Sequence, residues 1–242
     1  LGGVGKTSIV NSFLGQQIST KYFPTIGSSI SKKEYRLPKH LIRVNIWDIG
    51  GQRAFNPLNP VFFTNNDAAF LVFDLSNSEE SIKELRDVYL PSLVEKSENC
   101  IILVLGNKLD LITNDEELRK VTRENEIHSL PLAYVSALEN KNIKEVFELI
   151  VYNVLLDIES MRPSKKIAGV AEAFLTHIGK KKEDLERVLI NKGEVDTLNL
   201  EDITVSKEEE VAVGTGEDLI PFEIERVPPA RPLREDIADR LD

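Results

Sequence analysis

The chain has 242 residues, of which 41% are hydrophobic and 29% are charged, a balance that fits a globular protein with one domain and an extension. Its formal net charge of -10 argues against general nucleic-acid binding, because neutralising phosphates requires clustered Lys and Arg. No apolar run approaches the roughly 18–20 residues of a membrane span. The single cysteine, Cys100, excludes an internal disulfide and indicates a cytoplasmic protein.

The first residues form a glycine-rich segment that leads into an expected helix. Its glycines allow successive backbone N–H groups to curl around phosphate oxygens, and the N-terminus of the helix adds its dipole. Here Lys6 would reach the β- and γ-phosphates of a nucleotide, and the Thr7 hydroxyl would bind Mg²⁺. The alternative is a glycine-rich turn that only opens a helix. Because the sequence starts inside this loop and without Met, we expect it to be N-terminally truncated and to lack the strand that leads into the loop.

Apolar segments and amphipathic helices alternate from the first residues to about residue 160. Strands are expected over 29–37, 41–47, 68–75, 100–106 and 132–135, and helices over 7–15, 81–95, 116–126 and 143–160. The first two strands surround a turn and predict a hairpin, and the next two are nearly continuous apolar runs, as strands buried on both faces should be. This alternation predicts a mostly parallel sheet with helices on both faces. Binding sites in such folds gather at the carboxyl ends of the strands.

A second segment with chemical potential, Trp47–Gln52, directly follows an expected strand. A carboxylate at a strand end, here Asp48, can hold the hydration shell of Mg²⁺, and Gly51 supplies a backbone N–H that can close on a γ-phosphate. Gln52 is placed to orient an attacking water. The alternative is a strand that ends in a Gly-Gly turn.

A third segment, Asn107–Asp110, follows the strand that ends at Gly106. The Asp110 carboxylate can accept two hydrogen bonds, from N1–H and the 2-amino group of guanine, whereas adenine has no donor at either position. Asn107 would tie this segment to the glycine-rich loop, and the Lys108 stem would lie along the base. The alternative is an ordinary polar loop.

A fourth segment, Ser136–Leu138, follows the last expected strand. The Ala137 backbone N–H would meet guanine O6, a position at which adenine carries an amino group instead. The alternative is an ordinary strand-to-helix turn.

Beyond Met161 the composition changes. A linker is expected over 162–166 and helices over 167–178 and 183–190, followed by an acidic segment with several prolines. Residues 161–242 carry 19 acidic and 13 basic side chains. This acidic bias predicts disorder or folding on a partner.

Some conspicuous residues are expected to have structural roles. The three histidines share no metal-ligand spacing, and Cys100 at the start of a buried strand is expected to be part of the core. We expect Lys180–Lys182 to lie on a solvated helix face and Trp47 to pack at the end of its strand.

The four segments occur in one order, at strand ends, and at spacings that suit one pocket. Over residues 1–160 the arrangement resembles the Ras superfamily of small GTPases: Pro24–Gly27 is similar to the first switch of Rab and Ras proteins, and Trp47–Gln52 resembles the Arf pattern. The resemblance implies an α/β P-loop NTPase fold, the small G domain. Its sheet would be mostly parallel and six-stranded, with helices on both faces and its first strand missing from this chain. Residues 161–242 would form a C-terminal extension.

The resemblance also implies roles for individual residues. Thr25 would coordinate Mg²⁺ only when a γ-phosphate is present, and Tyr22 would close over the phosphates. Catalysis would rest on Gln52, Lys6 and Thr25, and the metal on Thr7, Thr25 and Asp48. The nucleotide-binding residues would be Gly2, Gly3, Val4, Gly5, Lys6, Thr7, Ser8, Tyr22, Thr25, Asp48, Gly51, Asn107, Lys108, Asp110, Ser136, Ala137 and Leu138.

The resemblance implies a GTP/GDP switch that binds Mg²⁺ and hydrolyses GTP slowly, with GTPase-activating, exchange and effector proteins as partners. The end of the chain, 239–242, has no cysteine for prenylation, so we expect no C-terminal prenyl anchor. The alternative is a GTP-bound scaffold with negligible hydrolysis that recruits partners through its extension. A third interpretation, a P-loop ATPase or kinase, is opposed by Asn107–Asp110.

Overall fold

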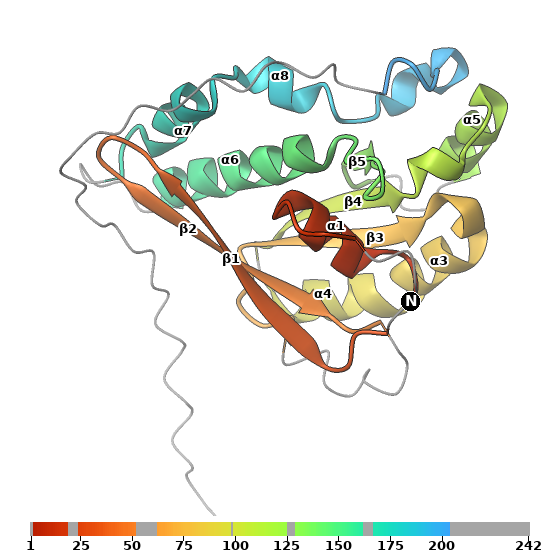
Figure 1. The fold of residues 1–242 in the computed structure, drawn as a ribbon, viewed down its shortest axis with the longest axis horizontal. Helices are drawn as coiled ribbons and strands as arrows, with labels where there is room; N and C mark the ends of the chain where they lie inside the picture. The colour runs from red at the N-terminus through yellow and green to blue at the C-terminus, as the bar shows by residue number, and fades with distance from the viewer. Residues whose placement is uncertain are drawn as a thin grey trace, which may run out of the picture.

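The computed structural model describes residues 2–18, 24–51, 62–97, 99–124, 129–161 and 167–203 (Figure 1). Its strands are β1 (Ser28–Arg36), β2 (Leu41–Ile49), β3 (Ala68–Asp74), β4 (Ile101–Asn107) and β5 (Leu132–Tyr134). Its α-helices are α1 (Lys6–Phe13), α3 (Ser78–Glu84), α4 (Leu90–Lys96), α5 (Asp115–Glu124), α6 (Ile143–Met161), α7 (Val170–Ile178) and α8 (Lys182–Glu186). Shorter helical turns are η2 (Leu75–Asn77), η3 (Leu85–Tyr89), η4 (Leu109–Leu111) and η5 (Lys192–Thr197).

The predicted hairpin is confirmed. Strands β1 and β2 pair antiparallel, with Ser28 opposite Ile49 and Arg36 opposite Leu41. Both strands differ from the predicted ranges by one or two residues at their ends, where local sequence is a weak guide. The hairpin brings the carboxyl end of β2 beside the start of β1.

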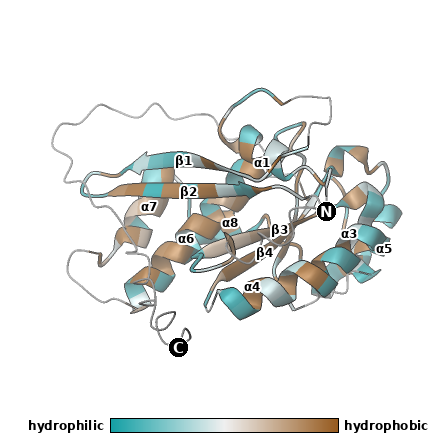
Figure 2. Ribbon diagram, turned by 90° about the horizontal axis from the view of Figure 1, so that it is seen from below, coloured by the Kyte–Doolittle hydropathy of each residue, from teal (hydrophilic) through white to brown (hydrophobic). Residues whose placement is uncertain are grey.

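Strands β3, β4 and β5 form a parallel sheet that is buried on both faces. Successive side chains of β3 alternate between two cores: Val72 packs with α1 and α6, whereas Leu71 and Phe73 pack with α3 and α4. At Gly106 a Cβ atom would lie 2.6 Å from the Tyr134 ring and 2.8 Å from Phe73, so the close packing of the strands requires glycine. Figure 2 shows β3 and β4 as largely hydrophobic and α5 as largely hydrophilic.

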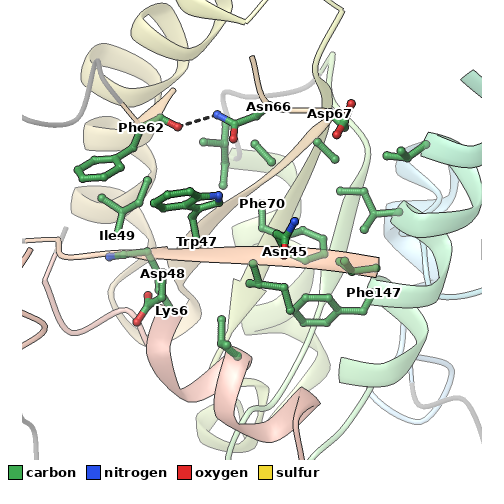
Figure 3. Close-up of a pocket in the computed structure, with 18 of the residues that line it drawn as sticks. Lys6, Asn45, Trp47, Asp48, Ile49, Phe62, Asn66, Asp67, Phe70 and Phe147 are labelled. Carbon is green, nitrogen blue, oxygen red and sulfur yellow. Dashed lines mark hydrogen bonds between the residues drawn. The ribbon is translucent and has the colours of Figure 1, made fainter. Parts of the chain in front are cut away.

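The sheet was predicted to have six strands, the first of them missing from this chain; the described residues contain five strands, which form two separate sheets. Between β2 and β3 lies a cavity of about 510 Å³, with α1 and α6 on one side and α4 on the other (Figure 3). The T-shaped pair Phe70 and Phe147 lines its apolar end, and Lys6 and Asp48 lie at its polar end.

The helices follow the sequence prediction except in detail. The helix predicted over 81–95 starts at Ser78 and runs continuously through α3, η3 and α4, with π-helical geometry over Leu85–Tyr89. The helix predicted over 183–190 ends at Glu186, and Leu189 instead forms an isolated antiparallel bridge with Ala133. No described helix combines the length and apolar character that a membrane crossing requires.

Residues 167–203 fold back on the strands and helices that precede them. Helix α7 packs against α6 and against the end of the hairpin, where the rings of Phe174 and Tyr35 meet edge to face with centroids 5.0 Å apart. Lys180 was expected on a solvated helix face, and that expectation is wrong: its side chain is 15% exposed and pairs with Glu145 and Glu148 of α6. The division of the chain at residue 160 stays a prediction. The acidic segment expected from about residue 193 is described as far as Ile203, and its remainder lies outside the described residues.

Candidate functional site

The glycine-rich loop ends at the N-terminus of α1. Gly5 caps the helix with a φ of 93°, a conformation that L side chains rarely adopt, and a Cβ at this position would collide with the amide of Asn107. Val4 is buried, Gly2 and Gly3 are exposed, and Ser8 lies in the first turn. The backbone N–H groups at the start of α1 therefore surround a surface with positive dipole character, where an anion is favoured.

Lys6 is half-buried beside this surface. Burial lowers the pKa of its ammonium group, and the negative charges of Asp48 and Glu84 oppose that shift. A phosphate at the N-terminus of α1 would add further negative charge beside the ammonium group and favour its protonated form.

The three residues expected to hold a metal meet in space. The Thr7 hydroxyl donates a hydrogen bond of 2.6 Å to Asp48 Oδ2 and lies 2.8 Å from the Thr25 hydroxyl. Asp48 is 4% exposed, and its other carboxylate oxygen, Oδ1, is buried with no hydrogen-bond partner among the described residues. An unsatisfied buried carboxylate oxygen is costly unless a cation or its water reaches it.

This donor set fits Mg²⁺. The ion takes oxygen ligands, keeps several waters and is usually bound by one or two carboxylates together with substrate phosphates. In the described ranges, no three His, Cys, Asp or Glu side chains come together to hold a metal, so an ion here would depend on the two threonine hydroxyls, Asp48 and phosphate oxygens.

The segment that carries Thr25 is bound to the end of β2. The Gly50 N–H donates a 2.8 Å hydrogen bond to the Gly27 carbonyl, and a Cβ on Gly50 would collide with the carbonyl oxygens of Thr25 and Gly27. Gly51 follows directly and is partly exposed. The two segments are thus in backbone contact beside the α1 N-terminus, so a ligand that moves one of them moves the other.

Asn107 joins three of the four predicted segments. It is 2% exposed, its Nδ2 donates to the Val4 carbonyl at 2.9 Å, and its Oδ1 accepts from the Ala137 N–H at 3.1 Å. One buried amide therefore fixes the glycine-rich loop and both predicted base-contacting segments relative to one another.

Asp110 and Lys108 have ordered partners. The Ser136 hydroxyl donates to Asp110 Oδ1 at 2.5 Å, which orients the carboxylate. Lys108 has a left-handed φ of 67°, and its ammonium group lies 2.5 Å from Asp74 Oδ2. Sequence analysis missed Asp74, although its position at the carboxyl end of β3, paired in register with Asn107 on β4, was a usable signal.

The predicted contact of Ala137 differs in one respect. Its N–H already donates to Asn107, so donation to guanine O6 would have to be shared between two acceptors. Leu138, which follows Ala137 in the same segment, is 61% exposed. Two predicted residues, Tyr22 and Gln52, lie outside the described residues. Trp47 was expected to pack at the strand end but is 46% exposed, with the Phe62 ring at 6.0 Å.

Comparisons with known proteins agree with this geometry. The model of the Ras family matches residues 1–156. The chain is 30% identical over 164 residues to the Ypt/Rab-type GTPase Rab7 of Neurospora crassa, covering 65% of this chain and 80% of that protein. It is 32% identical over 162 residues to the Ras-related protein Rab-7b of Mus musculus, covering 64% and 78%, and 31% identical over 164 residues to the Ypt/Rab-type GTPase ypt7 of Pyricularia oryzae, covering 65% and 80%.

Proposed function

The chain belongs to the Ras family of GTP-binding switch proteins, which hydrolyse GTP, and from that premise we propose that it is a slow, Mg²⁺-dependent switch whose two switch segments are joined at Gly50. The observation that carries the proposal is the cluster of Thr7, Thr25 and Asp48 beside the N-terminus of α1. The γ-phosphate is the group that GTP has and GDP lacks. A switch must hold its mobile segments through this group and release them when it leaves.

The residues around the phosphates have separate tasks in this proposal. The N-terminus of α1 and Lys6 bind the β- and γ-phosphates, while Thr25 and the Gly51 N–H contact the γ-phosphate side. Thr7, Thr25 and Asp48 would hold Mg²⁺, which when bound neutralises charge on the phosphate oxygens. Gln52 orients a water that attacks the γ-phosphorus. The bond to the β–γ bridging oxygen then breaks and gives GDP and phosphate.

Guanine selectivity in this proposal comes from Asp110 and from the loop after β5. Ser136 holds one carboxylate oxygen of Asp110, so the group faces the base in a fixed orientation. Asn107 keeps both base-contacting segments at a fixed distance from the glycine-rich loop. The phosphate and base contacts are thus prepared before the nucleotide binds, which lowers the entropic cost of binding.

The direct test is to identify the co-purified nucleotide and to follow a single turnover of GTP. We expect bound GDP or GTP, and hydrolysis with a rate constant far below the 1–100 s⁻¹ typical of kinases, on the order of 10⁻³ s⁻¹ or less, as in related GTPases without an activating partner. Gln52→Leu should lower that rate at least about tenfold, because the water loses its orienting group, whereas Gln16→Leu, an exposed residue after α1, should not. Bound guanine nucleotide without any hydrolysis would instead support a GTP-bound scaffold. Bound ATP would contradict the proposal.

The single tryptophan offers a second test. Trp47 lies next to Asp48, is nearly half exposed, and pairs in register with the exposed Ile30, so its surroundings depend on the switch segments. We expect its fluorescence emission to differ between the GDP-bound protein and the protein bound to a non-hydrolysable GTP analogue. Trp47→Phe should abolish the signal. Identical spectra in the two states would argue against a rearrangement at this place.

The same surface fits a partner that reads the nucleotide state. Ile26, Ile30 and Trp47 are exposed hydrophobic residues grouped around the segment that carries Thr25. Exposed apolar patches of this kind mark protein–protein contact sites. We therefore place the effector contact on β1 and the end of β2.

A further inference from the structure

The segment over residues 189–203, here called the strap, follows the outer edge of the parallel sheet. Leu189 forms an antiparallel bridge with Ala133 of β5, and the Ile190 N–H donates a 2.8 Å hydrogen bond to the Leu132 carbonyl. The Lys192 ammonium group donates to the Leu130 carbonyl at 2.7 Å. The strap therefore covers the edge of β5, the strand that leads into Ser136–Leu138.

The strap then crosses α5, which follows the Asn107–Asp110 segment. Arg119 of α5 donates to the Leu198 carbonyl at 2.9 Å and to Asn199 Oδ1 at 2.8 Å. Asp115, the first residue of α5, accepts a 2.9 Å hydrogen bond from the Leu200 N–H. These contacts fix the start of α5 only five residues after Asp110.

The last residue of the strap reaches the loop after β5. Asn142 is 4% exposed, and its Nδ2 donates to the Tyr134 carbonyl at 2.9 Å and to the Ile203 carbonyl at 2.7 Å. Asn142 comes directly after Lys141, whose backbone pairs with that of Ser136 in both directions. One buried amide therefore connects the strap, the end of β5 and the close of the Ser136–Lys141 loop.

We infer that the strap positions the two base-contacting segments, Asn107–Asp110 and Ser136–Leu138, and that Asn142 is the positioning residue for guanine selectivity. The inference rests on the proposed function, because it assumes that these segments bind guanine. Each segment leaves the carboxyl end of a strand, and the strap fixes its downstream side through Asp115 or Asn142. The Ser136–Asp110 hydrogen bond spans the two segments, so movement of either one misplaces the carboxylate.

The test compares GDP with inosine 5′-diphosphate (IDP), which lacks the 2-amino group, on the full chain with Mg²⁺. Asn142→Gly removes both hydrogen bonds and retains freedom to adopt the left-handed φ of 59°. We expect it to weaken GDP binding about tenfold more than IDP binding, because both bases offer N1–H and O6 but only guanine loses a charge-assisted hydrogen bond from its 2-amino group. Arg119→Leu removes the hydrogen bonds from α5 to the strap, and it should also reduce the preference for GDP over IDP.

The matched control is Asn140→Gly. Asn140 also has a left-handed φ, of 54°, but its side chain accepts a hydrogen bond from the Ser12 hydroxyl and, in the part of the chain that the structure describes, makes none to the strap. Both affinities should therefore stay within about twofold, the size of a minor surface effect. A general loss of stability would lower GDP and IDP affinity by the same factor. Such an equal loss in both Asn142→Gly and Arg119→Leu, or a wild-type preference for GDP over IDP in both, would overturn the inference. If the wild-type protein does not bind GDP, the proposed function itself fails.

Discussion

Asp110→Asn should weaken GDP binding on the order of 100-fold or more and remove most of the preference for GDP over ADP. In the proposed complex the carboxylate accepts two hydrogen bonds from guanine, and each hydrogen bond to a charged group contributes about 1.5–3 kcal/mol. An asparagine can accept only one of them and turns an N–H donor toward the other donor of the base. Ser136, which holds the carboxylate at 2.5 Å, loses its charged acceptor as well. Competition binding of GDP and ADP to the purified full chain measures the change.

Asp87→Asn is the matched control for this substitution. Asp87 is an exposed carboxylate that pairs with the neighbouring Arg86, so its loss should leave both affinities unchanged. If Asp110→Asn kept the wild-type preference for GDP, guanine would have to be recognised by other groups, and the assignment of Asn107–Asp110 would be wrong. Weaker binding of GDP and ADP by the same factor would instead indicate damage to the phosphate side.

The sequence predicted the alternation of strands and helices and the end of the sheet at which functional residues gather. Both follow from local rules: β3 and β4 are continuous apolar runs because both of their faces are buried, and their last residues, Asp74 and Asn107, lie side by side in register. The order of the motifs was therefore enough to predict that Thr7, Asp48 and Thr25 lie close together. The contact between Asn107 and the glycine-rich loop was predicted and is confirmed, whereas the hydrogen-bond partner of Ala137 was not predictable. The Ala137 N–H is directed at Asn107 through packing between residues that are 30 positions apart.

The extension shows the limit of composition as a guide. Lys180–Lys182 have the pattern of a solvated surface, yet Lys180 is drawn inward by two glutamates more than 30 positions earlier in the chain. Likewise, Asn142, a residue type typical of turns, is buried because Tyr134 and Ile203 offer carbonyl groups from two different parts of the fold. Contacts of this kind depend on tertiary structure, and no local period or motif encodes them.

Lys180→Met should lower the free energy of unfolding of the GDP-bound full chain by about 2–3 kcal/mol at pH 7, somewhat less than a fully buried broken ion pair costs. Lys180 Nζ lies 3.1 Å from Glu148 Oε2 and 3.3 Å from Glu145 Oε1, and the Glu148 side chain is 2% exposed. Methionine fills a similar volume but leaves the Glu148 carboxylate buried without its nearest cation. Urea unfolding at a fixed GDP concentration measures the loss. Lys144→Met is the control and should cost less than about 0.5 kcal/mol, because the Lys144 side chain is 64% exposed and its ammonium group lies 4.0 Å from Glu148 Oε1.

The sign of the pH dependence separates this ion pair from simple packing. Burial raises the pKa of Glu148 above its ordinary value of 4.5, although Lys180 and Lys144 oppose the shift, so the stability linked to this group is full below pH 4.5 and is lost as pH rises through the raised value. Burial alone would lower the pKa of Lys180, but the two glutamates outweigh this effect and the pKa is raised. The stability linked to Lys180 is therefore full below pH 10.5 and is lost only as pH rises above that value.

The cost of Lys180→Met should therefore be largest at neutral pH and should shrink as pH falls toward 4.5 and Glu148 takes up a proton. Adding Glu148→Gln to Lys180→Met should recover part of the loss at pH 7, because the buried charge is gone. A loss that is independent of pH and unchanged in the double variant would mean that Lys180 contributes only the packing of its aliphatic stem.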